Sequence, residues 1–201
     1  MKCIFDRLHW IWLFPLSLIQ GCASFYEEPL EWRVRVVVPQ HYDAWVQFFD
    51  METSGVRHWR VPIGSLSCCW KSPSGKGGGG YQIPPPNFFQ VRWFSYAERK
   101  FYGRLVELPT NLPEMMSRQT PAPPIEGQPL YEPQDTLVIG LAPGGQIVVW
   151  LMNYAKNAEE VLRVQANELD VNVAEYEVWI RDYETEHGKY LKQHGLQLDR
   201  W

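Results

Sequence analysis

Regular alternation of apolar and polar residues near the start of the chain constrains the fold more than any other feature. From Glu31 to Pro39, every second residue is apolar, namely Trp32, Val34, Val36 and Val38. A period of two is typical of a β-strand that is buried on one face. Comparable segments predict further strands at 44–51, 56–61, 88–96, 101–108, 136–141, 146–152 and 161–166.

Turn-forming residues separate two pairs of these strands. The polar segment Ala97–Lys100 lies between strands 88–96 and 101–108, which predicts an antiparallel hairpin with Val91 and Trp93 facing the core. Pro143-Gly144-Gly145 lies between the strands 136–141 and 146–152. Its glycines can adopt positive φ angles, so we expect a second hairpin there.

Helical periodicity is concentrated at the end of the chain. Between Val173 and His194, apolar and aromatic residues recur three and four positions apart, which predicts an amphipathic helix. Gly195 is a natural stop signal, and a short helix is plausible near 112–118. The sequence therefore predicts an α+β fold: a hairpin-rich antiparallel β-sheet of about six to eight strands with a C-terminal amphipathic helix.

Two segments rich in proline and glycine interrupt the pattern, at 72–87 and 109–134. We interpret both as long loops of one domain, because the strands on either side are enough for one sheet. Four consecutive glycines, Gly77–Gly80, predict a mobile stretch in the first loop. The prolines of the second loop predict a stiffer segment.

The N-terminus has the features of an export signal. Lys2 and Arg7 precede the apolar run 8–19, and Ile19-Gln20-Gly21-Cys22 follows. This is the pattern of a bacterial lipoprotein signal, which predicts lipidation of Cys22 and, because Ala23 follows it, anchoring in the outer membrane facing the periplasm. We expect a signal peptide at 1–21, a tether at 22–30 and one α+β domain at 31–201. A buried first helix with an incidental cysteine is the alternative.

After removal of the leader, Cys68 and Cys69 are the cysteines that remain besides the lipidated one. Adjacent cysteines cannot join distant parts of a fold. They could form a vicinal disulfide, since the periplasm permits disulfides. The interpretation we favour is a pair of small buried residues beside Trp70.

Composition excludes several classes of protein. The net charge of −4 leaves no basic surface for nucleic acid, and 45% hydrophobic residues exclude a disordered chain. The apolar runs are too short for a membrane-spanning helix in the mature protein, which needs about 20 residues. Basic residues prevail over 31–108 and acidic residues over 156–201, which indicates either a solvated acidic helix face or a polarised surface that steers a protein partner.

Motifs for catalysis are sparse. Ser65 lacks the second glycine of a nucleophile elbow, and Lys76 lacks the context of a phosphate-binding loop. Glu184 and His187 form one Glu-x-x-His pair, whereas a di-iron site needs two, and His194 is two helical turns from His187. We predict no catalytic, cofactor-binding or metal-binding residues, and we do not expect an enzyme.

Several motifs stand in a characteristic order: the strand ending at Pro39, the step Cys68-Cys69-Trp70, the hairpin from Trp93 to Tyr102, and Val148-Val149-Trp150-Leu151 after Gly145. Over Glu31 to Trp179 they resemble the domain of unknown function 2931 family of bacterial lipoproteins. The resemblance implies an immunity protein of the type VI secretion system, held in the periplasm against an antibacterial phospholipase effector. It supplies no catalytic motif.

Two functional classes follow from these observations. The first is a binding protein that blocks a toxic lipase by direct contact, and the second is an envelope lipoprotein that binds glycan or another envelope component through exposed aromatic residues. An inhibitor needs an ordered contact surface, because ordering a flexible loop costs affinity. We therefore expect the stiff segment 109–134 at the interface, with contacts from Met115, Met116, Arg118 and Tyr131.

Overall fold

Two β-sheets packed face to face form the body of the protein. The computed structural model describes residues 30–80 and 83–201. A five-stranded sheet has the order β12-β11-β10-β1-β5, with bounds Glu159–Gln165, Gln146–Met152, Thr136–Ala142, Trp32–Val37 and Lys76–Gly80. A six-stranded sheet has the order β13-β7-β6-β2-β3, with bounds Asn167–Leu169, Lys100–Glu107, Phe88–Ser95, Ala44–Thr53 and Arg57–Arg60, and β4 (Gly64–Leu66) also pairs with β2. This architecture confirms the α+β prediction.

The alternating residues of β1 explain the main core. Trp32, Val34 and Val36 are fully buried between the two sheets, where they join residues of the second sheet such as Phe49 and Trp93. The two predicted hairpins, β6–β7 and β10–β11, are both present. Val91 and Trp93 face the core, as the alternation predicted.

The five-stranded sheet is covered on both faces. Val138, Val148 and Trp150 lie on the face away from the main core and pack against Cys69 and Trp70. Burial on both faces explains why β10 and β11 read as continuous apolar runs rather than as alternating ones. One pairing differs from a purely antiparallel sheet, because β1 runs parallel to β10.

The predicted mobile stretch Gly77–Gly80 is instead ordered in β5, which pairs antiparallel with β1. Glycine is needed here because the indole of Trp32 lies where a side chain would stand: a Cβ on Gly80 would be 2.5 Å from its ring. The prediction of a mobile loop was therefore wrong. Local composition indicated flexibility, whereas the requirement for glycine comes from close packing.

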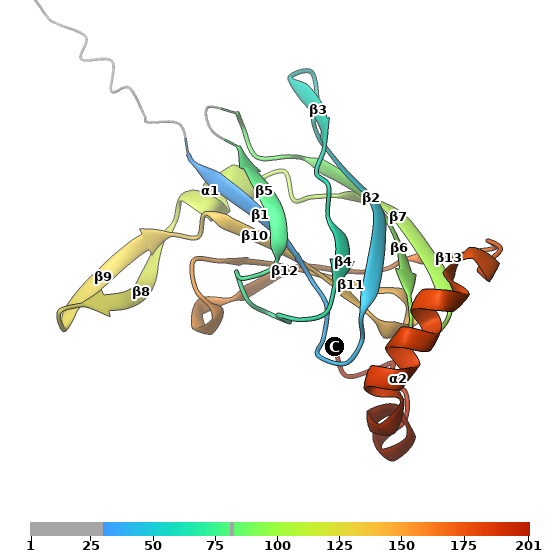
Figure 1. The fold of residues 1–201 in the computed structure, drawn as a ribbon. Helices are drawn as coiled ribbons and strands as arrows, with labels where there is room; N and C mark the ends of the chain where they lie inside the picture. Colours follow the sequence, from blue (N-terminus) through green and yellow to red (C-terminus); the bar gives the residue numbers. More distant parts are fainter. Residues whose placement is uncertain (1–29, 81–82) are drawn as a thin grey trace, which may run out of the picture.

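The predicted loop 109–134 also has regular structure. A short helix, α1 (Leu112–Ser117), occupies the expected place, and a separate hairpin, β8 (Gln119–Ile125) and β9 (Gln128–Pro133), follows it. Both strands of a two-stranded hairpin are edge strands, which tolerate proline, so proline content did not exclude strands. Figure 1 shows this hairpin, in yellow, extending away from the sheets.

The C-terminal helix α2 (Glu177–His194) follows three short 3₁₀ turns along the chain, η1 (Pro143–Gly145), η2 (Ala155–Asn157) and η3 (Ala174–Tyr176). Gly195 ends the helix with a φ of 70°, as predicted, and its N–H donates to the carbonyl of Leu191. Ile180 and Tyr183 pack on Phe94 and Phe101 of the six-stranded sheet. The helix therefore covers one end of the outer face of that sheet.

Cys68 and Cys69 form a vicinal disulfide. Cys68 is exposed and Cys69 is half-buried, so the interpretation of two small buried residues was wrong. Cys69 adopts a φ of 84°, which a non-glycine residue rarely does. Cys69 and Trp70 are only partly buried, and both pack against the face of the five-stranded sheet that points away from the main core.

Candidate functional site

The four residues predicted to contact a partner do not share one surface. Met116 is fully buried in the main core, and Met115 packs against that core from its edge. A partner cannot reach Met116, so its prediction as a contact residue was wrong. The helix α1 has one face toward the core, and the sequence pattern of so short a helix did not show which one.

Arg118, directly before the projecting hairpin, and Tyr131, within it, are exposed. The Arg118 guanidinium lies 3.7 Å from the Glu159 carboxylate, and Tyr131 is 61% exposed on β9. The exposed residues Arg118, Ile125 and Tyr131 are called the hairpin surface below. Whether they contact a partner stays a prediction.

Two asparagines hold the base of the hairpin. The Asn153 side-chain amide donates to the carbonyls of Glu132 and Pro133, at 3.2 and 3.4 Å. The Asn157 amide donates to Thr120 Oγ1 at 3.0 Å. Because an isolated two-stranded hairpin is only marginally stable, these bonds to the β11–β12 connection account for its defined position.

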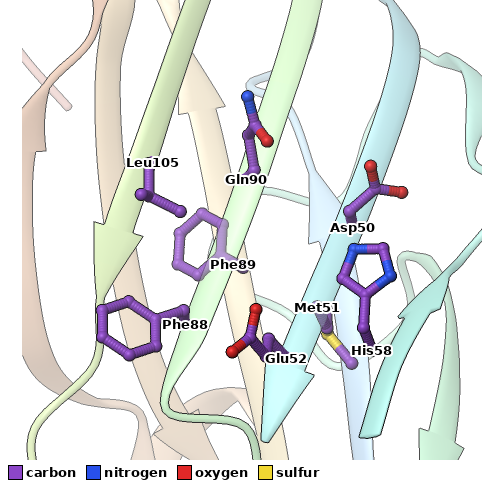
Figure 2. Close-up of a pocket in the computed structure, with 8 residues that line it drawn as sticks. All are labelled: Asp50, Met51, Glu52, His58, Phe88, Phe89, Gln90 and Leu105. Carbon is purple, nitrogen blue, oxygen red and sulfur yellow. The ribbon is translucent and has the colours of Figure 1, made fainter. Parts of the chain in front are cut away.

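A second candidate surface is the part of the outer face of the six-stranded sheet that α2 does not cover. The strand register places Arg60, Asp50, Gln90 and Leu105 in one row across β3, β2, β6 and β7. The next row on one side contains Phe88, and the next row on the other contains Phe48 and Arg92. Figure 2 shows the central part of this surface, with Asp50, Gln90 and Leu105 on three neighbouring strands.

We define the open face as Phe48, Phe88, Gln90, Arg92 and Leu105. Leu105 is 63% exposed, and the two phenylalanines are half-buried. Two more aromatic residues border the open face at its helical end: Trp45 of β2 and Trp179 of α2 stack with parallel rings, centroids 6.4 Å apart. Both are more than one third exposed. The result is an aromatic and apolar surface formed by a rigid sheet and a helix.

Two arginines, Arg60 and Arg92, lie on this surface together with the carboxylates of Asp50 and Glu52. The Arg60 guanidinium donates two hydrogen bonds to Asp50, at 2.7 and 2.9 Å, and lies over the Phe48 ring. These hydrogen bonds hold the pKa of Asp50 below its ordinary value. Arg92 lies over the Phe101 ring, and its Nε is buried without a hydrogen-bond partner. Arginines stacked on aromatic rings are common among the residues that dominate protein interfaces.

Two shallow hollows lie on this surface. The first, with Asp50, Glu52, His58 and Phe88 among its lining residues, has a volume of about 50 Å³. The second, with Phe48, Gln90, Arg92 and Leu105 among its lining residues, has a volume of about 300 Å³, at the lower end of the range of about 300–1,000 Å³ that is usual for small-molecule sites. Both are open to solvent, so the surface is accessible to another macromolecule.

The histidines and carboxylates noted in the sequence are dispersed or paired. Glu184 forms an ion pair with Arg99, and His194 is exposed. His187 instead lies close to His41 and Asp43, which belong to the β1–β2 connection. Over residues 30–80 and 83–201, no group of three or more His, Cys, Asp or Glu side chains is arranged to hold a metal ion.

This proximity of His41, Asp43 and His187 was not predicted. No sequence signal indicated it, because it depends on how α2 docks. Burial raises the pKa of the Asp43 carboxyl, and it raises the pKa of the nearby Tyr183 hydroxyl too.

Within the described residues, no helix is both long and apolar enough to span a membrane. The predicted lipidation site Cys22 and the signal peptide lie outside those residues. The predicted tether lies outside them too, apart from Leu30.

Comparison with known proteins gave one match. A family model described as "Protein of unknown function (DUF2931)" matches residues 20–199. Neither a curated protein nor a solved structure matched the chain.

Proposed function

The chain belongs to the DUF2931 family of proteins of unknown function, and on that premise we propose that it is a lipid-anchored immunity protein. In this proposal, the protein stands on the periplasmic side of the bacterial envelope. It neutralises a phospholipase effector of the type VI secretion system by direct protein contact. It needs no catalytic residue of its own.

The proposed anchor is Cys22 in the segment Ile19-Gln20-Gly21-Cys22. Two or more acyl chains on one cysteine hold a protein stably at a membrane. The tether of residues 22–30 spans at most about 30 Å when fully extended. The domain would therefore stand close to the lipids that a phospholipase attacks.

The open face is the observation that carries the proposal. Its apolar residues and Arg92, with Arg60 beside them, lie on a sheet whose other side is the main core, so the surface is ordered before any partner binds. An ordered surface avoids the entropy cost of fixing a loop on binding. Its hollows are shallow and open to solvent, so a partner can contact the surface directly.

The glycan-binding alternative rests on exposed aromatic residues. Sugars stack on the free faces of aromatic rings, and Trp45 and Trp179, whose parallel rings have centroids 6.4 Å apart, are each more than one third exposed. Glycan binding remains an outcome that direct measurement can detect.

Three exposed aliphatic residues allow a matched test. Leu105 on the open face is 63% exposed, Ile125 on the hairpin surface is 62% exposed, and Val56 in the β2–β3 turn is 61% exposed. Each is replaced by Asp in the full chain. Each variant is produced in the periplasm together with a candidate phospholipase effector of the type VI secretion system, and survival and complex formation are measured.

The wild-type chain and Val56→Asp should protect the cells and bind the enzyme, and Leu105→Asp should lose both properties. Loss in Ile125→Asp instead would place the contact on the hairpin surface. If the wild-type chain neither binds the enzyme nor protects the cells, the immunity proposal fails. Binding of an envelope glycan by that chain would then support the alternative.

A further inference from the structure

Two histidines from distant parts of the chain meet beside α2. His41 lies in the β1–β2 connection and His187 lies on α2, and their Nδ1 atoms are 3.4 Å apart. Both side chains line a hollow of about 570 Å³ that also contains Glu186. This pair is separate from the open face and plays no part in the proposed function.

His41 is held in an unusual conformation that aims its ring at His187. Its φ is 71°, which costs a non-glycine residue free energy and persists only where the surroundings impose it. The Tyr183 hydroxyl donates a hydrogen bond of 2.7 Å to the carbonyl of His41. The Tyr190 ring stacks on the imidazole, with centroids 4.0 Å apart. The ring is therefore positioned before any ligand arrives.

The other side of the His187 ring faces carboxylates. Its Nε2 is 3.4 Å from Asp43 Oδ1 and 3.7 Å from the Glu186 carboxylate. Nε2 and the Asp43 oxygen are both buried, and neither has a hydrogen bond of good geometry. A carboxylate beside the far ring nitrogen is the usual companion of a metal-binding histidine.

We propose that His41 Nδ1 and His187 Nδ1 bind a divalent transition-metal ion such as Zn²⁺. Two nitrogens bound to a tetrahedral zinc ion, each about 2.0–2.1 Å from the metal, stand about 3.3–3.4 Å apart. The observed separation of 3.4 Å matches this value. Imidazole nitrogen is a ligand that zinc, copper and nickel prefer.

With two protein ligands, the site is open. Water fills its remaining positions from the adjoining hollow, and Asp43 and Glu186 supply negative charge next to the ion. Cys68 and Cys69 line the same hollow, but their disulfide provides no thiolate. Binding requires both Nδ1 atoms to be unprotonated, as metal binding to histidine generally does. The ion joins the β1–β2 connection to α2.

The test uses the full chain, purified in detergent and freed of metal with a chelator. Titration with Zn²⁺ in a calorimeter should show one saturable site per chain. His41→Ala and His187→Ala should each weaken this binding by more than Asp43→Asn does, and loss of such a supporting carboxylate typically weakens affinity roughly 10- to 100-fold. His194→Ala, an exposed histidine on the same helix, and Cys68→Ser with Cys69→Ser should leave the affinity unchanged.

A measurement on the wild-type chain alone tests the proposal even if a variant fails to fold. Zn²⁺ should raise the melting temperature, because it binds the folded state only, whereas Mg²⁺, which prefers oxygen ligands, should not. The proposal is overturned by the absence of a saturable site. It is also overturned if the His41→Ala and His187→Ala double variant keeps wild-type affinity, or if binding depends on the cysteines.

Discussion

Glu98 and Gly144 join the two sheets at their turns: the N–H of Gly144, in the β10–β11 turn, donates a 2.9 Å hydrogen bond to the Glu98 carboxylate in the β6–β7 turn. The same carboxylate accepts hydrogen bonds of 2.8 Å from the hydroxyls of Ser95 and Tyr102. Burial, together with this bond to Glu98, raises the pKa of the Tyr102 hydroxyl. One side chain thereby fixes one predicted hairpin against the other.

Glu98→Gln should destabilise the fold by about 1–3 kcal/mol. The amide has one oxygen and one NH₂ group, so at least one of the three donors loses its acceptor. Chemical denaturation measures the free energy of unfolding. Glu107→Gln, at an exposed position on β7, is the control and should change it by less than about 0.5 kcal/mol. Equal effects of the two substitutions would show that Glu98 does not join the turns.

Gly80→Ala should be destabilising, by about 1–3 kcal/mol, because its Cβ would stand 2.5 Å from the indole of Trp32. Gly78→Ala is the matched control on the same strand. Its Cβ would be 3.5 Å from Val61, an ordinary contact, so a small effect is expected. Thermal melting of the two variants compares them directly. A tolerated Gly80→Ala would indicate that β5 is not held against β1 as described.

Met116→Ala should cost about 2–5 kcal/mol of stability, because the side chain is fully buried in the core. Tyr131→Ala should change stability by less than about 0.5 kcal/mol, because Tyr131 is 61% exposed. Denaturation curves give both values. A loss of partner binding in Met116→Ala would therefore reflect unfolding, whereas a loss in Tyr131→Ala would locate a contact.

The Asp50–Arg60 pair should make stability depend on pH. Because the pKa of Asp50 is lowered in the folded state, its contribution is fully present above the unfolded pKa of about 3.9 and is lost as the pH falls through the folded value. The difference in unfolding free energy between wild type and Asp50→Asn should accordingly shrink as the pH falls below about 4. Added salt should reduce it, since Arg60 is largely exposed. A difference independent of pH would contradict this account.

Cys22→Ser should abolish lipidation and leave a soluble or uncleaved precursor. Palmitate labelling and membrane fractionation of cells producing the full chain measure this outcome. Cys3→Ser, in the expected leader, is the control and should be labelled normally. Unchanged labelling of Cys22→Ser would refute the proposed lipoprotein signal.

The sequence by itself determined the local elements. Alternation in 32–38 and 88–108 predicted strands and a hairpin, and the three-and-four spacing ending at Gly195 predicted α2. These features can be recognised locally, because the apolar residues that face the core recur with the period of the strand or helix that carries them. The start of the helix was placed at Val173, four residues before α2 begins, since the preceding 3₁₀ turn continues the same spacing.

Only the tertiary structure decided which distant segments meet. The parallel pairing of β1 with β10 joins Arg33 to Thr136, and the pairing of β5 with β1 places Gly80 against the indole of Trp32, which leaves no room for a larger residue. The burial of Met116 and the approach of His187 to His41 depend likewise on how α1 and α2 dock. The periodicity of a segment indicates which of its residues face an apolar environment, but it does not identify the residues that form that environment. Long-range packing therefore selects the partners, and with them the surfaces that remain open.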